Sequence, residues 1–220
     1  MKQKQPARNY PSLNSLRAAA RECRACPLWR PATQTVFGEG PEKARIIMVG
    51  EEPGDREDII GRPFVGPAGQ LLRRALAEVG LDPAELYLTN VVKHFKFEMR
   101  GKRRLHKRAN AEEQAACRQW LQAEFDRIRP AIVVCLGATA AKALLGRSFS
   151  VMAQRGRWLP LGDAFAIATL HPSALLRMPE SERARGYREF VRDLRKVAAG
   201  PAPVTTARKA PSAAQPKGPR

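Results

Sequence analysis

The sequence predicts an α/β domain with three layers, α-β-α, around a mainly parallel four-stranded central sheet. Short apolar runs with the length of buried strands alternate with longer segments that have helical spacing. The runs are followed by glycine or by polar loop residues, which is typical of strands that lead into a helix. Strands that alternate with helices in this way form a mainly parallel sheet covered by helices on both faces.

The first half of the chain provides two strands and two helices. Residues 12–22 have helical spacing, and residues 45–50 form a short apolar strand that ends in glycine. A helix is predicted over 67–80, because leucines and alanines recur there at helical spacing and a glycine closes the segment. Residues 86–92 form the second strand.

The second half repeats this alternation. A helix over 110–128 is followed by a strand over 131–136 and by a helical segment over 138–145. Residues 164–170 form the fourth strand, and residues 180–199 form a terminal amphipathic helix. We find no internal repeat, so a single domain is expected.

The domain is expected to span residues 12–199. Residues 1–11 are polar and are predicted to be frayed. Residues 200–220 are rich in proline, alanine and lysine and contain no acidic residue, which predicts a disordered basic tail. The chain shows no apolar run near the roughly 20 residues that span a bilayer and no secretory signal, so we expect a cytoplasmic monomer without a membrane partner.

The charge of the chain favours a polyanionic partner. Lys and Arg number 39 against 21 Asp and Glu, a formal net charge of +18. Residues 93–108 concentrate eight of these cations in what reads as a loop. Because many basic proteins do not bind nucleic acid, the charge alone leaves DNA or RNA binding as one of several alternatives.

Polar residues follow the ends of three predicted strands. Residues 50–55 read Gly-Glu-Glu-Pro-Gly-Asp after the first strand, Asn90 and Lys93 accompany the end of the second, and His171 follows the fourth. Ligands of parallel sheets bind beyond the carboxyl ends of the strands. The sequence therefore predicts an active site at this edge of the sheet.

The four cysteines suggest a metal site. Cys23 and Cys26 form a C-x-x-C motif, and Cys117 and Cys135 follow much later in the chain. Disulfides are uncommon in intracellular proteins, whereas four thiolates hold either zinc or an iron–sulfur cluster. The spacing leaves these two metals open, and it also leaves open that Cys117 and Cys135 are only buried helix and strand residues.

Several motifs together resemble the iron–sulfur uracil-DNA glycosylases of the family 4 type, and within them the UdgX branch, whose members become covalently attached to uracil-DNA. The resemblance covers most of the chain. It rests on the Cys23-x-x-Cys26 motif, on Gly50-Glu-Glu-Pro-Gly54, on 61–69, on Leu88-Thr-Asn90-Val-Val-Lys93-His94-Phe95, on Cys117 and Cys135, and on His171-Pro-Ser173. The branch is indicated by the inserted loop Gly101-Lys-Arg-Arg-Leu-His106.

The resemblance implies a uracil-DNA glycosylase fold and a [4Fe-4S] cluster on Cys23, Cys26, Cys117 and Cys135. It implies three catalytic residues: His171 would stabilise the departing base, Glu51 would face the developing sugar cation, and His106 would attack the sugar. The remaining residues are assigned to substrate binding: Phe64 stacks on uracil, Asn90 reads its edge, Glu52 and Asp55 assist, and Lys93, Arg104 and Arg177 contact phosphate or position the loop.

Each of these residues also has a plain structural interpretation. Phe64 fits a core aromatic, Asn90 a turn, Glu51 and Asp55 solvated loop acids, and His106 a phosphate contact. Two departures from the branch are present: Glu52 stands where the branch has Gln, and Leu105 where it has Ile.

Three functions therefore stay in competition. The first is uracil excision in single- or double-stranded DNA that ends in a covalent adduct. The second is ordinary turnover by a glycosylase of base excision repair. The third is DNA binding by a non-catalytic iron–sulfur protein.

Overall fold

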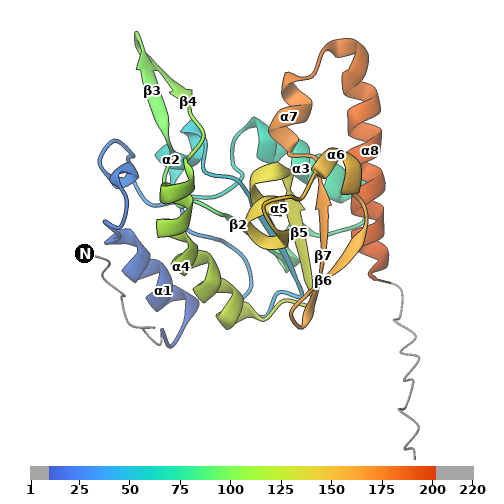
Figure 1. Ribbon diagram of the computed structural model, residues 1–220, viewed down its shortest axis with the longest axis horizontal. Coiled ribbons are helices and arrows are strands. Elements are labelled where there is room, and N and C mark those ends of the chain that lie inside the picture. The colour runs from blue at the N-terminus through green and yellow to red at the C-terminus, as the bar shows by residue number, and fades with distance from the viewer. Residues whose placement is uncertain (1–9, 202–220) are drawn as a thin grey trace, which may run out of the picture.

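A computed structural model describes residues 10–201 and shows a three-layer α/β domain (Figure 1). Its central sheet has five strands in the order β2-β1-β5-β7-β6. The first four pair in parallel, and β6 pairs antiparallel with β7 at one edge. The strands are β1 (Ile46–Gly50), β2 (Leu86–Asn90), β5 (Ile132–Leu136), β6 (Trp158–Leu161) and β7 (Ala164–Thr169).

The mainly parallel sheet confirms the predicted fold class, and β6 is the strand that the sequence did not reveal. This strand contains a proline and alternates poorly, so its pattern resembles a loop. A second departure concerns the basic segment, which is not a loop. It forms a separate antiparallel hairpin, β3 (Phe97–Arg100) and β4 (Arg103–His106), that projects from the body of the domain (Figure 1).

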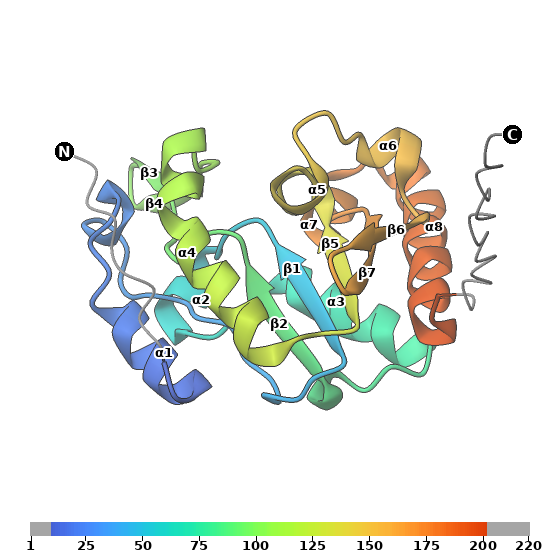
Figure 2. The same cartoon turned by 60° about the horizontal axis from the view of Figure 1, so that its bottom comes forward.

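Helices cover both faces of the sheet. The α-helices are α1 (Leu13–Arg21), α2 (Asp55–Ile60), α3 (Pro67–Glu78), α4 (Ala111–Ile128), α5 (Gly137–Leu145), α6 (Val151–Gln154), α7 (Pro172–Arg177) and α8 (Glu180–Ala199). Two short 3-10 helices are η1 (Pro27–Trp29) and η2 (Pro83–Glu85). On one side α1 packs on α4, and on the other α3 packs on α7 and α8 (Figure 2).

The core consists of the strands and the helix faces that meet them. Ile47, Val133 and Ile167 of three adjacent strands are fully buried between these helices. A run of apolar residues in each parallel strand is what burial on both faces requires. The buried core thus holds the strands in place, and the strands set the positions of the loops that follow their carboxyl ends.

Both edges of the sheet are blunted. At the β2 edge, the backbone of Glu39 exchanges two hydrogen bonds with the backbone of Leu88. At the other edge, β6 carries Pro160, which has no backbone N–H to donate. These features remove one backbone donor from the outer side of each edge strand.

The terminal predictions are tested only in part. Tyr10, which the sequence assigned to a frayed segment, packs against Trp120 with ring centroids 6.1 Å apart, so that assignment is wrong for this residue. The rest of the predicted basic tail, from residue 202 on, and residues 1–9 lie outside the described residues. Within 10–201, no helix is both long and apolar enough to cross a membrane.

Candidate active site

The predicted site residues gather where the sheet topology reverses. The connection after β1 leads to β2 on one side, and β5 lies on the other side of β1. Such a switch point leaves a crevice beyond the carboxyl ends of the strands. Glu51, directly after β1, accepts a hydrogen bond from Thr139 of α5 at 2.8 Å and one from Arg108 at 2.7 Å, so it joins the two sides of the crevice.

Phe64 and Asn90 converge on Gly50 at the end of β1. A Cβ atom at residue 50 would lie 2.3 Å from Oδ1 of Asn90 and 2.7 Å from Cζ of Phe64. Only glycine leaves room for both side chains there. An aromatic ring beside an amide that can donate and accept is the arrangement that a planar base with a polar edge would need.

The backbone at Phe64 is unusual. Its φ angle is +55°, a left-handed conformation that is uncommon for a bulky residue. Arg73 donates to the carbonyl oxygen of Phe64 at 2.8 Å, and Gly69 packs so close to this carbonyl that no side chain would fit. Backbone strain of this kind persists where the surroundings impose it and is frequent at functional sites.

His171 is held as a neutral imidazole. Its Nδ1 accepts a hydrogen bond from the backbone N–H of Ser173 at 3.1 Å, which leaves the ring proton on Nε2. Burial lowers the pKa of His171 to about 4, against an opposing effect of the Glu51 charge. The ring can therefore donate a hydrogen bond from Nε2 at neutral pH without carrying a charge.

His106 ends β4 and lies beside the buried carboxylate of Glu52. The two atoms Nε2 of His106 and Oε1 of Glu52 are 3.0 Å apart, but their directions do not make a hydrogen bond. The other oxygen of Glu52 accepts from the backbone N–H of Ala109 at 2.8 Å. Burial raises the pKa of Glu52, while His106 and Ala109 partly oppose this shift. The hairpin thus brings His106 close enough to His171 for the protonated form of His106 to lower the pKa of His171.

Arg104 fastens the hairpin to α2. Its guanidinium donates to Asp55 and to the buried Asp58, with both distances at 2.6 Å. The same group lies over the rings of Phe95 and Phe97. Of the two roles predicted for Arg104, loop positioning fits this geometry, because its donors are already engaged. Asp55 likewise serves the hairpin.

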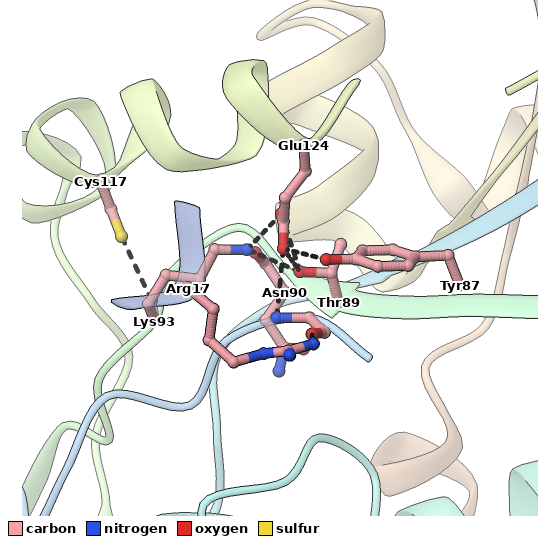
Figure 3. A network of polar contacts seen from close by, with 8 residues as sticks. Arg17, Tyr87, Thr89, Asn90, Lys93, Cys117 and Glu124 are labelled. Atoms are coloured by element: carbon pink, nitrogen blue, oxygen red, sulfur yellow. Dashed lines mark hydrogen bonds and ion pairs between the residues drawn. The ribbon is translucent and has the colours of Figure 1, made fainter. Parts of the chain in front are cut away.

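The predicted phosphate contact of Lys93 is wrong. Figure 3 shows its side chain directed toward Glu124 and Thr89, and its ammonium donates to each of them at 2.6 Å. It also donates to the carbonyl oxygen of Asn90 at 2.8 Å. Both Lys93 and Glu124 have almost no exposed side-chain surface. The lysine therefore braces the end of β2 against α4 and does not face solvent.

Arg177 ends α7 on the same side of the molecule and is exposed. Its positive charge lowers the pKa of His171, so the two side chains lie near one another. A phosphate contact of Arg177 stays a prediction. Sequence reasoning missed Thr139, Arg108 and Asp58; Thr139 follows β5 by three residues, and the rule on carboxyl ends of strands would have included it.

Three of the four cysteines gather near the N-terminal end of α4. Cys23 and Cys26 lie close enough to Cys117 for their thiolate forms to raise its pKa. All three cysteines are free of disulfide bonds. Trp120 donates to the sulfur of Cys23 at 3.1 Å, and the backbone N–H of Lys93 donates to the sulfur of Cys117 at 3.2 Å. Burial raises the pKa of Cys117 to about 12.

Cys135 does not belong to this group, so its prediction as a metal ligand is wrong. It is fully buried in the central strand β5, between β1 and β7, and burial alone raises the pKa of its thiol to about 12. The strand pattern that made it a core residue was the better interpretation. Among residues 10–201, no three Cys, His, Asp or Glu side chains converge closely enough to hold a single metal ion.

His94 is the side chain that sequence reasoning overlooked at this place. It directly follows Lys93, whose backbone contacts Cys117, and its Nε2 lies 2.9 Å from Oγ1 of Thr35. Burial lowers the pKa of His94 to about 4, and the charge of Arg24, between Cys23 and Cys26, lowers it further. A buried neutral imidazole is a common metal ligand. The thiols of Cys23, Cys26 and Cys117 and the imidazole of His94 are therefore the candidate metal-binding groups in this part of the molecule.

Comparison with known proteins identifies the family. The family model described as the uracil DNA glycosylase superfamily matches residues 37–195. The chain belongs to this superfamily. It is 41% identical to the type-4 uracil-DNA glycosylase of Thermotoga maritima over 167 residues, which cover 75% of this chain and 83% of that protein. It is 34% identical to the type-4 uracil-DNA glycosylase of Archaeoglobus fulgidus over 196 residues, which cover 84% and 92%.

Membership of the uracil-DNA glycosylase superfamily confirms the resemblance at the level of the superfamily and of its type-4 relatives. The matched region contains every predicted site residue except Cys23 and Cys26, which precede it. The crevice of Glu51, Phe64, Asn90 and His171 is therefore part of the glycosylase domain. The UdgX branch and its covalent attachment stay predictions.

Proposed function

We propose that the chain removes uracil from DNA and becomes joined to the resulting sugar through His106. Uracil must leave the base stack before an enzyme can reach its glycosidic bond. In this proposal the ring of Phe64 stacks on the flipped base and the amide of Asn90 bonds its polar edge, since both side chains converge on Gly50. The type-4 uracil-DNA glycosylases among the relatives support uracil in DNA as the substrate.

In this proposal, the bond between C1′ of the sugar and N1 of uracil breaks, and its electron pair leaves with the base. His171 donates a hydrogen bond from Nε2 to the departing anion, and its neutral form favours this role over the transfer of a proton. Glu51 stabilises the positive charge that develops on the sugar. Preorganised groups of this kind supply much of the rate enhancement of many enzymes.

The placement of His106 carries the covalent part of the proposal. The hairpin is tied down by Arg104, and it brings His106 to the same crevice as His171 and Glu52. A nitrogen lone pair of the imidazole would bond to C1′ in place of water. The other ring nitrogen then loses its proton to solvent, and the departed uracil anion takes up a proton from solvent. A well-placed group of this kind has an effective concentration of about 10⁵ M or more, so it outcompetes water at the sugar.

The experiment is a denaturing gel of the protein incubated with DNA that contains one uracil. We expect a shifted band that resists heat and denaturant, with the attachment mapped to His106. The variant His106→Ser should give no shifted band and should release free uracil. If the wild-type protein releases uracil with turnover and no band, the chain is a conventional glycosylase of base excision repair. If it gives neither, it only binds DNA.

We also propose that an iron–sulfur cluster is held by Cys23, Cys26 and Cys117, with His94 as the fourth ligand. The cluster would supply a structural tie between the N-terminal segment and α4. Cys135→Ala should keep the brown colour and the iron content of the wild-type protein, whereas His94→Ala should lose iron. If the Cys135 variant loses iron and the His94 variant keeps it, the fourth ligand is Cys135 and not His94. Stoichiometric zinc without iron would contradict the cluster itself.

A further inference from the structure

Arg108 combines a hydrogen bond to a residue of the site with a guanidinium that is otherwise free. Its side chain is 69% exposed, and its Nε donates to Oε1 of Glu51 at 2.7 Å. Within residues 10–201, its two terminal nitrogens have no hydrogen-bond partner. By contrast, Arg104 is 19% exposed and donates to two carboxylates. Arg108, two residues after β4, therefore offers a guanidinium that is anchored to Glu51 and open at its two terminal nitrogens.

The position of this guanidinium is fixed from two directions. The backbone N–H of Ala109, the next residue, donates to the buried Glu52. The side chain is held by Glu51, which is itself fixed by Thr139 of α5. A guanidinium whose Nε is anchored and whose terminal nitrogens face solvent is prepared for an oxyanion, because paired N–H groups match two phosphate oxygens.

We propose that Arg108 binds the DNA phosphate next to the uracil nucleotide and bridges it to Glu51. This inference rests on the proposed excision of uracil from DNA, but not on covalent attachment through His106. Glu51 must face a developing sugar cation, and in the free protein an arginine partly neutralises it. A phosphate at the open side of Arg108 draws part of that positive charge away. Binding of the substrate backbone thereby restores the negative potential of Glu51 where the reaction needs it.

The proposal separates Arg108 from the general positive charge of the hairpin. Most cations on β3 and β4 can attract DNA at any phosphate, and such contacts carry no information on the base. Arg108 is anchored to a residue of the site, so it should contact one phosphate only. Arg103, an exposed residue at the start of β4, has no ion pair among the described residues and provides a matched control.

The test is a double-mutant cycle between protein and DNA. Single-stranded DNA would carry one 2′-fluoro-2′-deoxyuridine, whose fluorine suppresses cleavage and hence adduct formation. Single phosphates around this nucleotide would be replaced one at a time by neutral methylphosphonate. Binding of the wild-type protein, Arg108→Gln and Arg103→Gln to each DNA would then be measured at one salt concentration.

Wild-type protein should lose affinity roughly ten- to a hundredfold at one phosphate beside the uracil, the size expected for one charge-assisted hydrogen bond. Arg108→Gln should bind the unmodified DNA more weakly by the same factor and should be insensitive to neutralisation of that phosphate. Arg103→Gln should stay as sensitive as the wild-type protein. If Arg108→Gln loses as much affinity as the wild-type protein at each neutralised phosphate, the proposal is overturned.

A second measurement separates binding from chemistry. With natural uracil-DNA, Arg108→Gln should need a higher protein concentration than the wild-type protein to reach half of its maximal single-turnover rate, by the same factor as its loss of affinity. The maximal rate itself reports on the chemical step. A defect in folding would lower this rate together with the affinity. A large loss of the saturated rate would show that Arg108 acts in the chemical step, which contradicts the proposed role. Wild-type protein that binds as expected but never releases uracil would instead overturn the proposed function.

Discussion

Glu52 is a carboxylate without exposed surface and with one oxygen that no described donor satisfies. Burial raises its pKa above the ordinary value, so the folded protein holds the proton more tightly than the unfolded chain. The stability that this group contributes is therefore present at low pH and is lost as the pH rises through its folded pKa. Glutamine, which stands here in the branch that the chain resembles, would avoid this loss.

We accordingly predict that Glu52→Gln is more stable than the wild-type protein at neutral pH. The amide oxygen can still accept from Ala109, and no buried charge remains. The difference should shrink as the pH falls toward the ordinary pKa of glutamate. Thermal melts of both proteins between pH 4 and 8, values that bracket this titration, would measure it. A variant that is less stable at every pH would show that the charge of Glu52 stabilises the fold through His106.

His171→Gln should slow excision of uracil while it preserves binding of uracil-DNA. Removal of one donor to a developing anion costs roughly 10²–10³-fold in rate. Because the pKa of His171 is about 4, the wild-type rate should show no titration of this ring above about pH 5. Single-turnover rates of both proteins across this range test the prediction. A wild-type rate that rises and falls with an ionisation near pH 6.5 would contradict a neutral donor.

At the scale of elements, the buried pair of Lys93 and Glu124 joins the end of β2 to the middle of α4 (Figure 3). Lys93→Met would leave the carboxylate of Glu124 buried without a counter-charge, which typically costs about 3–5 kcal/mol. The double variant Lys93→Met, Glu124→Met should recover much of this loss. Urea unfolding of the three proteins provides the comparison. Equal stability of the single and double variants would mean that the two charges are not coupled.

The elements also show what the sequence can and cannot predict. The four parallel strands were predictable because burial on both faces requires continuous apolar runs, and the site followed from the rule on their carboxyl ends. The burial of Lys93 could not be predicted, because its partner Glu124 lies 31 residues away on a helix. The cations that follow Lys93 in the sequence suggested an exposed side chain instead. Cys135 was included among the metal ligands because a count of thiols ignores the strand that holds it. His94 belongs to a quoted motif, but nothing in the sequence indicated that its neighbour Lys93 lies against Cys117. The hairpin was missed because each of its strands has only four residues, two of them charged.

At the scale of the whole molecule, the net charge of +18 predicts binding to DNA that weakens steeply with salt. Residues 202–220, outside the described part of the chain, include lysine and arginine but no acidic residue. Deletion of residues 200–220 should therefore weaken binding to any DNA and reduce its salt dependence. The preference for uracil over thymine should not change. Titrations of uracil- and thymine-containing DNA at several salt concentrations would decide, and a truncated protein without this preference would refute the prediction.

The blunted edges of the central sheet bear on how the protein behaves against its own copies. A free edge strand is a template on which a second molecule can add its own strand. Here the backbone of Glu39 already bonds to Leu88 of β2, and Pro160 has no N–H to donate from β6. Concentrated solutions should consequently resist growth of intermolecular sheet, even when high salt screens the repulsion between cationic surfaces. The same two positions are where a single substitution, such as Pro160→Thr, would first open a route to aggregation.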